Sequence, residues 1–387
     1  MQLLAWASLL SFATAAPVIQ PRAAQLIPGS YIVKLKDGAS DSALQDTIKQ
    51  LKSVRTDHVY RAGRFKGFAA RLNPSVLDAV SKLPEVEYIE QDAVVTAFDF
   101  ITQVDVPWGL ARISHRTTGQ TSYVYDESAG EGTCSYIIDT GVYVNHTQFE
   151  GRAEWLANFA DTDDTDGHGH GTHVAGTIGG VDYGVAKKTK LFAVKVLGAS
   201  GSGTLSGVIA GIDFVAADSA TRASTDCPNG SVANLSLGSS RSTAVNAAAA
   251  AAVRAGVFLS VAAGNADDDA QFWSPASEQT VCTVGATDAE DVRAYFSNWG
   301  TLVDVFAPGV DVLSSWIGGP TATNTISGTS MAAPHVAGLG AYLLALEGSK
   351  TPAELCQYIK DIATPNTITD LPSGTFNGIA FNGNPNA

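Results

Sequence analysis

Three motifs contain the residue types that acyl transfer needs, namely a hydroxyl, an imidazole and a carboxylate. Ser330 lies in SGTSMAAPHVAG, where a glycine-containing turn leads into a long apolar helix. A helix N-terminus offers outward-pointing N–H groups and a dipole that favours an oxyanion. Asp139 ends the apolar run SYIID, and His170 lies among glycines in DGHGHGTHVAG. A helix cap would explain Ser330 and a turn would explain Asp139, but neither explains the three motifs together.

Two further residues belong with these motifs. Asn265 follows the apolar run VAAG and could donate a hydrogen bond to the oxyanion, although an isolated asparagine after glycine is usually a turn residue. Pro334 stands four residues after Ser330. We expect Pro334 in the first turn of the helix, where its missing N–H breaks no hydrogen bond.

A metal centre is the main chemical alternative. His168, His170 and His173 have the spacing H-x-H-x-x-H, which resembles a zinc cluster whose imidazoles hold the ion that activates water. However, Thr172 stands where such a pattern usually has a carboxylate. A zinc site would also give the serine and aspartate motifs no role. The sequence therefore favours a nucleophilic serine over zinc.

Short apolar strands and glycine-punctuated helices alternate around these motifs. We expect strands at 135–139, 191–197, 232–237 and 257–264, and helices at 205–217 and 244–254. Continuous apolar runs are typical of parallel strands buried on both faces. The predicted fold class is therefore α/β, a parallel sheet with helices on both faces. Asp139 would lie at the carboxyl end of a strand, where such sheets bind ligands.

The first hundred residues have a different pattern. Leu3–Ala16 is apolar, ends in small residues and is too short to span a bilayer, as in a secretory signal, although no Lys or Arg precedes it. After it we expect strands at 30–35, 65–72 and 86–89 and helices at 42–52 and 74–82. This order predicts a small α+β ferredoxin-like domain. The chain then divides into a signal peptide (1–15), a front domain (16–97) and a catalytic domain (98–387).

Composition argues against several functions. The net charge is −14, and nucleic-acid binding depends on clustered positive charge, so we expect no nucleic-acid partner. Beyond the N-terminal run the chain has no 18 unbroken apolar residues, so we expect a soluble mature product without a membrane span. We also expect a monomer. Segment 17–96 is slightly basic, with 11 Lys and Arg against 9 Asp and Glu, which favours its association with the acidic remainder.

The cysteines predict disulfides. Cys134, Cys227, Cys282 and Cys356 lie too far apart for a C-x-x-C metal clip. A secreted chain enters an oxidising compartment, so two disulfides are expected, and four cysteines allow three pairings.

With these motifs the chain resembles the subtilisin family of serine proteases, in its fungal proteinase K-like branch. The blocks DTG, HGTH and GTSMA follow in the order Asp, His, Ser, and the resemblance covers nearly all of residues 97–387. It implies that Ser330 attacks a peptide carbonyl, that His170 takes and returns the proton, and that Asp139 orients the imidazole. Asn265 and the Ser330 N–H would bind the oxyanion. His173 would then be a structural helix residue.

The resemblance also implies how protein and peptide substrates bind. Two segments match substrate-binding strands and one matches the walls of a specificity pocket: Gly201, Ser202, Gly203; Ser236, Leu237, Gly238; and Ala262, Ala263, Gly264. An extended peptide would add as a strand, which gains main-chain hydrogen bonds with little sequence demand. Small walls leave a roomy apolar slot, so we expect large hydrophobic residues before the scissile bond.

The front domain resembles the inhibitory prodomain of the same family. This likeness implies a zymogen that is secreted to the extracellular space and removes its own prodomain. The family pairing further implies the disulfides Cys134–Cys227 and Cys282–Cys356, and Val174 stands in place of a buried free cysteine found in some relatives.

The resemblance implies a structural calcium ion as cofactor. Its ligands would be the Asp304 carboxylate and the carbonyl oxygens of Gln279 and Val281, although Gln279 stands where proline is frequent. Glycan attachment is expected in the sequons at Asn145 and Asn229, whereas a third sequon residue, Asn234, is expected to be buried.

A relative that binds peptides without cleaving them is the main non-enzymatic alternative. Such a protein is expected to have lost a member of the triad. This chain retains Asp139, His170 and Ser330, which favours an active endopeptidase.

Overall fold

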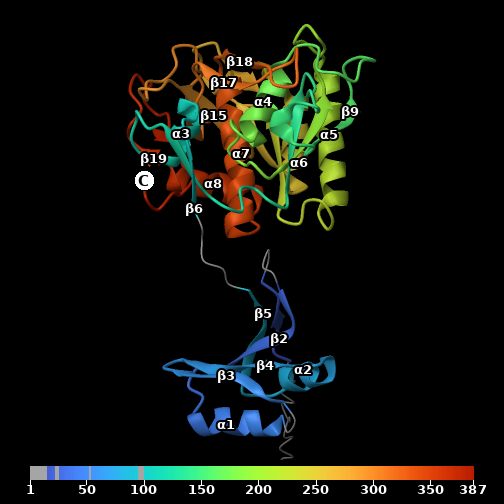
Figure 1. Ribbon diagram of the computed structural model, residues 1–387, viewed down its shortest axis with the longest axis vertical. Helices are drawn as coiled ribbons and strands as arrows, with labels where there is room; N and C mark the ends of the chain where they lie inside the picture. The colour runs from blue at the N-terminus through green and yellow to red at the C-terminus, as the bar shows by residue number, and fades with distance from the viewer. Residues whose placement is uncertain (1–14, 22–25, 52–53, 95–99) are drawn as a thin grey trace, which may run out of the picture. The chain divides into compact units, whose positions relative to one another are not determined.

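The computed structural model describes residues 15–21, 26–51, 54–94 and 100–387. The chain divides between residues 97 and 98 into two compact units, each of which is described by itself (Figure 1). The predicted signal peptide, apart from its last residue, and the predicted end of the front domain lie outside the described residues.

The smaller unit is a five-stranded sheet with two helices. Its strands lie in the order β1-β5-β2-β4-β3. Leu44 and Val80, one from each helix, share a buried cluster with Val33 and Phe68 of the sheet, so both helices cover one face. The elements are β1 (Val18–Ile19), β2 (Leu26–Leu35), α1 (Asp41–Gln50), β3 (Thr56–Ala62), β4 (Phe65–Arg71), α2 (Pro74–Ser81) and β5 (Val86–Ala93).

Strand β3 is absent from the prediction made from the sequence. Its residues, TDHVYRA, are all half-buried or exposed, because β3 forms the edge of the sheet and pairs with β4 alone. A strand with so few apolar residues gives little periodic signal. With β3 included, β2 to β5 follow the order β-α-β-β-α-β, which is the ferredoxin-like arrangement.

The larger unit is built on a nine-stranded sheet with the order β19-β20-β16-β15-β13-β11-β8-β10-β9. Neighbouring strands are parallel except for the pair β19 and β20. The strands are β8 (Thr133–Asp139), β9 (Ala153–Asn158), β10 (Lys190–Lys195), β11 (Gly230–Leu235), β13 (Phe258–Ala262), β15 (Cys282–Thr287), β16 (Val305–Pro308), β19 (Thr364–Pro365) and β20 (Gly378–Ile379).

Helices and short strand pairs complete this unit. The helices are α3 (Trp108–Ser114), α4 (His170–Gly179), α5 (Leu205–Arg222), α6 (Thr243–Arg254), α7 (Thr329–Glu347) and α8 (Pro352–Ile362). Three antiparallel pairs are β6 (Phe100–Val104) with β7 (Ser122–Asp126), β12 (Ser239–Ser240) with β14 (Trp273–Ser274), and β17 (Val312–Ser315) with β18 (Thr323–Ile326). Two single turns of 3₁₀ helix are η1 (Thr147–Phe149) and η2 (Ala270–Phe272).

Alternate residues of the central strands face opposite helix layers. In β8, Tyr136 and Ile138 pack in one buried cluster with Ile212 of α5 and Ala249 of α6. Ile137, between them, packs in another cluster that contains residues of α4 and α7. Helices therefore cover both faces of a mostly parallel sheet, as Figure 1 shows, and the predicted α/β fold class is confirmed.

Helix α7 is the central core helix of the larger unit. Within the described part of the chain it is the one helix that is long and apolar enough to cross a membrane, but 83% of its most apolar window is buried inside the protein. Its apolar character is therefore explained by burial against the sheet, since it shares the largest buried cluster with strands β13, β15 and β16.

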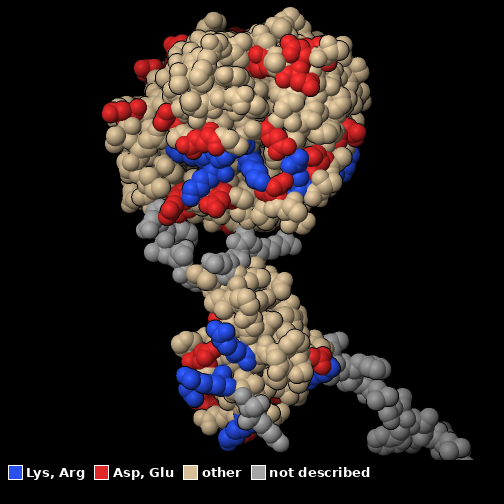
Figure 2. Space-filling view, turned by 45° about the vertical axis from the view of Figure 1, so that its right-hand side comes forward, with Lys and Arg blue, Asp and Glu red and all other residues tan. Residues whose placement is uncertain are grey.

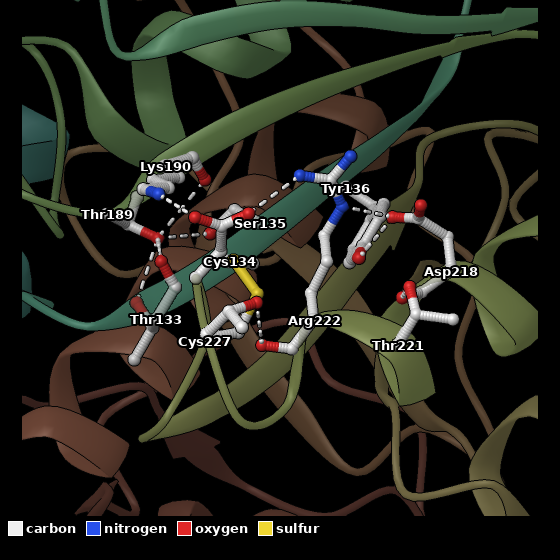
Figure 3. Close-up of a disulfide and its surroundings, with 12 residues drawn as sticks. Thr133, Cys134, Ser135, Tyr136, Thr189, Lys190, Asp218, Thr221, Arg222 and Cys227 are labelled. Atoms are coloured by element: carbon white, nitrogen blue, oxygen red, sulfur yellow. Dashed lines mark hydrogen bonds and ion pairs between the residues drawn. A yellow bond between two sulfur atoms is a disulfide. The ribbon is translucent and has the colours of Figure 1, made fainter.

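Both disulfides expected from the family pairing are formed, Cys134–Cys227 and Cys282–Cys356, and no cysteine is free. The first ties β8 to the segment after α5 (Figure 3). Beside it, Arg222 of α5 donates to Asp218, which also accepts a hydrogen bond from the Tyr136 hydroxyl (Figure 3). On the face of the larger unit seen in Figure 2, basic and acidic side chains intermingle, and large areas carry neither.

Candidate active site

Asp139 and His170 are in direct contact. Asp139 is the last residue of β8 and is fully buried, and its Oδ1 lies 2.8 Å from Nδ1 of His170. The same oxygen accepts a hydrogen bond of 2.7 Å from the Thr140 N–H. His170 is the first residue of α4, and 18% of its side chain is exposed. With Nδ1 donating to the carboxylate, the other ring nitrogen, Nε2, is left as a base for a reacting group.

A glycine is required immediately after the histidine. A Cβ atom on Gly171 would collide with the Gly141 carbonyl oxygen and would lie 3.2 Å from the Cβ of Asp139. The Gly171 N–H in turn donates to the Thr140 hydroxyl at 2.9 Å. Helix α4 can therefore begin beside the end of β8 only with glycine at this position.

Asp166 fixes the loop that carries the histidine, and nothing in the sequence motifs singled it out. One of its oxygens accepts hydrogen bonds from the Thr140 hydroxyl and the N–H groups of His168 and Gly169, at 2.8–3.0 Å. The other accepts from the N–H and hydroxyl of Thr172, at 3.0 and 2.6 Å. Asp166 is buried, so these five bonds hold the start of α4 against the end of β8. The one feature of the sequence that could have indicated this role is the position of the Asp166 carboxylate, four residues before His170.

Burial and two neighbouring carboxylates set the pKa of His170. Burial lowers this pKa, while the charge of Asp139 and its hydrogen bond raise it, and the charge of Asp166 raises it further. The balance places the pKa of His170 above its ordinary value of 6.5. A raised pKa favours the imidazolium, which is the form that a general base reaches after it takes a proton.

Ser330 occupies the second position of α7 and is tied to strand β11. Its hydroxyl donates to the Ser236 carbonyl at 3.2 Å, and the Ser236 hydroxyl donates to the Ser330 carbonyl at 2.7 Å. The Asn234 side chain donates to the Ser236 hydroxyl at 2.8 Å. Ser330 is thus held in a fixed position relative to the segment that follows β11.

Pro334 lies inside α7, and the prediction that it falls in the first turn is wrong. A residue at this position would normally donate its N–H to the carbonyl four residues earlier, which is that of Ser330. Proline has no N–H, so the Ser330 carbonyl is free to accept the Ser236 hydroxyl instead. The structure therefore replaces the missing helical hydrogen bond with a contact to the neighbouring strand.

Asn265 presents its amide N–H groups next to Ser330. Its side-chain oxygen accepts hydrogen bonds from the N–H and the hydroxyl of Thr329, both at 2.8 Å, which orients the amide. A Cβ placed on Gly328 would lie 3.5 Å from Nδ2 of Asn265 and 3.6 Å from the Ser330 N–H nitrogen. The two donors therefore border one small space, which glycine leaves open.

Asn298 is a second residue that sequence motifs did not reveal. It is buried, and its side-chain oxygen accepts from the N–H groups of Ala266 and Asp268, at 3.0 and 3.1 Å. Its amide donates to the Ala263 carbonyl at 2.8 Å. These bonds shape the turn that carries Asn265, and the asparagine shows no motif because its partners lie 30 to 35 residues away in the chain.

Two adjoining cavities lie beside these groups. The larger, about 440 Å³, is lined by His170 and by all of the predicted strand residues Gly201, Ser202, Gly203, Ser236, Leu237 and Gly238. The smaller, about 260 Å³, is lined by the predicted wall residues Ala262, Ala263 and Gly264, and by Asn265, Trp273 and Ser330. Leu237 and Gly238 line both, so one extended chain can occupy both cavities.

Comparisons with known proteins agree with this arrangement. A family model described as the subtilase family matches residues 130–379. The chain belongs to the subtilase family. A second model, described as peptidase inhibitor I9, matches residues 30–98. This subtilase is therefore a subtilisin-like serine endopeptidase, and its smaller unit is a prodomain of the inhibitor I9 type.

Fungal proteases are among the most similar relatives of this subtilase. A cuticle-degrading protease from Metarhizium anisopliae is 55% identical over 95% of this chain and 93% of its own. Proteinase T from Parengyodontium album is 59% identical over 78% of this chain and 100% of its own. The crystal structure of a cold adapted subtilisin-like serine proteinase covers 72% of this chain and 98% of that chain, with a TM-score of 0.67 and 44% identity.

The histidine cluster of this subtilase does not have the geometry of a zinc site, because among the described residues no three possible metal-ligand atoms from this cluster lie within 4.8 Å of one another. His173 is buried, and its Nε2 lies 2.9 Å from the Val312 carbonyl oxygen, so this nitrogen is in use as a hydrogen-bond donor. Burial lowers the pKa of His173 to about 4, which keeps the ring neutral. Thr172, which stands where the zinc pattern usually has a carboxylate, donates its hydroxyl hydrogen bond to Asp166. His173 is accordingly a structural residue of α4, as the resemblance implied.

The residues around Asp304 do not fit a calcium ion bound as the resemblance implied. One oxygen of Asp304 lies 2.9 Å from Nζ of Lys360, and the other accepts a hydrogen bond of 3.0 Å from the Thr283 N–H. Asp304 also lies near both sulfurs of the Cys282–Cys356 disulfide, within 4.8 Å, but disulfide sulfurs are not thiolate ligands. The family makes calcium a candidate ion, but the predicted carboxylate ligand already contacts a cation.

The sequon residues of this subtilase differ in exposure. Asn145 is exposed. Asn229 is half-buried, and its amide nitrogen, the atom that would carry a glycan, donates to the Glu131 carbonyl at 2.8 Å. Asn234 is fully buried in β11, as predicted.

Proposed function

We propose that this subtilase cleaves peptide bonds by a mechanism in which Ser330 is the nucleophile and His170 is the general base. Asp139 orients the imidazole of His170 and stabilises its protonated form. The hydrogen bond of 2.8 Å between Asp139 and Nδ1 of His170 is the observation that supports this assignment most strongly. It assigns the proton of the imidazole to Nδ1 and leaves Nε2 to accept a second proton.

The first chemical step forms an acyl-enzyme. The Ser330 hydroxyl turns from the Ser236 carbonyl, gives its proton to Nε2 of His170 and bonds the peptide carbonyl carbon. The carbonyl oxygen becomes an oxyanion in the space that Nδ2 of Asn265 and the Ser330 N–H border. His170 then returns the proton to the leaving amine, and water repeats the sequence to release the acid.

The substrate is a protein or peptide in extended form, bound with broad specificity. It would pair with Gly201–Gly203 on one side and Ser236–Gly238 on the other, through main-chain hydrogen bonds. The side chain before the scissile bond would enter the cavity of about 260 Å³. Because Ala262, Ala263 and Trp273 line this cavity, it favours a large hydrophobic side chain.

The chain is further proposed to be secreted and to mature by cutting itself. The apolar N-terminal run and the I9-type prodomain support this proposal. The proposed cut lies between about Val95 and Ile101, after the last strand of the prodomain, β5. The pairing of Phe100–Val104 with β7 in the larger unit supports a cut near the start of that strand. Glycan attachment is proposed at Asn145, which is exposed, ahead of Asn229, whose amide is hydrogen-bonded.

The test is the maturation of Ser330→Ala in a host without other proteases. This variant should fold, because the serine hydroxyl supplies little packing, and should stay at the size of prodomain plus protease. The matched control is Ser327→Ala, an exposed serine in the same turn, which should mature and cleave peptides as the wild type does.

Two further measurements separate the alternatives. Added active enzyme should trim the Ser330→Ala precursor in trans, and a sulfonyl fluoride should abolish the activity of the wild type. Normal maturation of Ser330→Ala would contradict both the nucleophile and the self-processing. Immediate, zinc-reversible loss of activity with a chelator would instead indicate a metallohydrolase.

A further inference from the structure

Asp304 and Lys360 form an ion pair between helix α8 and the amino end of strand β16. Asp304 immediately precedes β16, and Lys360 lies in the last turn of α8. Nζ of Lys360 lies 2.9 Å from Oδ1 of Asp304, and the two side chains are 26% and 24% exposed. The pair is therefore largely shielded from water, which makes it stronger than a fully exposed surface pair.

The lysine is held in place from two further directions. Its ammonium lies 5.4 Å from the ring centroid of Phe376, a cation–π distance. Lys360 also follows Cys356 by one helical turn, and Cys356 is bonded to Cys282 at the start of β15. The disulfide and the ion pair thus connect one face of α8 to the amino ends of the neighbouring strands β15 and β16.

The carboxylate is held in place as well. Oδ2 of Asp304 accepts the Thr283 N–H at 3.0 Å, and the Asp304 N–H donates to the Thr283 carbonyl at 2.9 Å. Asp304 therefore has one oxygen bound by the backbone and the other by an ammonium. A calcium ion needs six to eight oxygen ligands, and it would have to displace a positive charge from Asp304, the carboxylate predicted to bind it.

We propose that the Lys360 ammonium takes the place of a calcium ion at Asp304, so that a cation covalently part of the chain fixes α8 to the sheet. A calcium ion bound to Asp304 would lie close to the positively charged Lys360 ammonium. Like charges repel strongly at short range in a partly buried site, so the ammonium and a divalent ion cannot share the carboxylate. The stability that Asp304 supplies should then be independent of calcium, and it should depend on Lys360.

The experiment measures the melting temperature of the mature enzyme, inactivated with a sulfonyl fluoride to prevent autolysis, in calcium and in chelator. Four forms are compared: wild type, Asp304→Asn, Lys360→Ala and Lys350→Ala. Lys350 is the matched control, since it too pairs with a carboxylate, that of Glu347 at 3.2 Å, and lies near an aromatic ring, 4.8 Å from the ring centroid of Tyr358. It has no contact with Asp304 in this arrangement.

In chelator, Lys360→Ala should melt about 1–4 °C below the wild type, from the typical strength of a partly exposed pair in a domain of this size. Calcium should then raise its melting temperature, because the freed carboxylate can accept an ion. Lys350→Ala should gain no calcium response. Asp304→Asn should leave whatever calcium response the wild type has unchanged.

Two results would overturn the proposal. One is a wild-type calcium response that disappears in Asp304→Asn, which would mean that the ion binds this carboxylate despite the lysine. The other is a Lys360→Ala variant that melts at the wild-type temperature in chelator, which would mean that the ammonium stabilises nothing.

Discussion

Replacing Asp166 with asparagine should affect both the stability of the enzyme and its dependence on pH. The buried carboxylate accepts five hydrogen bonds, and its charge helps to raise the pKa of His170. Asparagine has nearly the same shape but has one acceptor oxygen and no charge. The substitution therefore removes the electrostatics of the residue and leaves its volume.

The cost follows from the hydrogen bonds. The amide oxygen can keep the three bonds from Thr140, His168 and Gly169, but each loses the strength that a charged acceptor gives, about 1 kcal/mol apiece. The amide NH₂ would face the buried Thr172 N–H, which loses its acceptor at a cost of about 1–3 kcal/mol. We expect a decrease of about 4–6 kcal/mol in the free energy of unfolding.

The pH effect has a definite sign. Loss of the Asp166 charge removes one of the influences that raise the pKa of His170, so this pKa falls toward its ordinary value. The base is active when His170 is neutral, so the acid limb of kcat/KM should move to lower pH. The variant would then keep more of its maximal activity in mildly acidic solution than the wild type does.

Denaturant unfolding of the sulfonyl fluoride-inactivated enzyme and a pH profile of peptide hydrolysis measure the two effects. The control is Asp164→Asn, which removes the same charge from an exposed position in the same loop. The control should unfold like the wild type. If Asp166→Asn matched the wild type in both measurements, the carboxylate would not hold the loop and would not influence His170.

Three more outcomes test other parts of the site. Asn265→Ala should lower kcat by roughly 10²–10³-fold with little change in KM, because its hydrogen bond forms fully in the transition state; an unchanged kcat would remove Asn265 from the oxyanion site. Gly171→Ala should destabilise the enzyme by about 1–3 kcal/mol or more and reduce kcat/KM, while Gly319→Ala, where the added methyl meets open space, should do neither. Finally, kcat/KM of the wild type should reach half of its plateau at a pH above 6.5, since the pKa of His170 is raised; half-maximal activity below that pH would contradict the balance of charge and burial at His170.

Much of the fold could be predicted from the sequence, because its elements bury apolar side chains in periodic patterns. The strands at 135–139, 191–197 and 232–237 correspond to β8, β10 and β11, whose residues are almost all buried. Edge strand β3 could not be predicted, since it buries too little to need an apolar pattern. Local periodicity reports burial, and an edge strand is specified by the partner it pairs with.

The residues of the site that lie within short sequence motifs could be predicted, and those outside the motifs could not. The Asp139–His170 contact and the lining of the two cavities follow the motifs. Asp166 and Asn298 were missed because their role is to accept hydrogen bonds from backbone groups, and any polar residue in a loop can do this. Lys360 was missed because it is 56 residues from Asp304, so the spacing in the sequence could not show that a cation already lies beside that carboxylate.

The proline inside α7 affects how firmly Ser330 is held. Ser330 and Ser236 are joined by two hydrogen bonds. The Ser330 carbonyl, which Pro334 leaves free, accepts from the Ser236 hydroxyl, and the Ser330 hydroxyl donates to the Ser236 carbonyl. An α-helix rises about 1.5 Å per residue, so sliding α7 by a single residue along its axis would break both links. The two hydrogen bonds therefore oppose a shift of α7 relative to the segment that follows β11. In the mechanism proposed above, the substrate peptide and Ser330 would therefore be held by the same segment, and the Ser330 hydroxyl would need only a side-chain rotation to reach the peptide carbonyl.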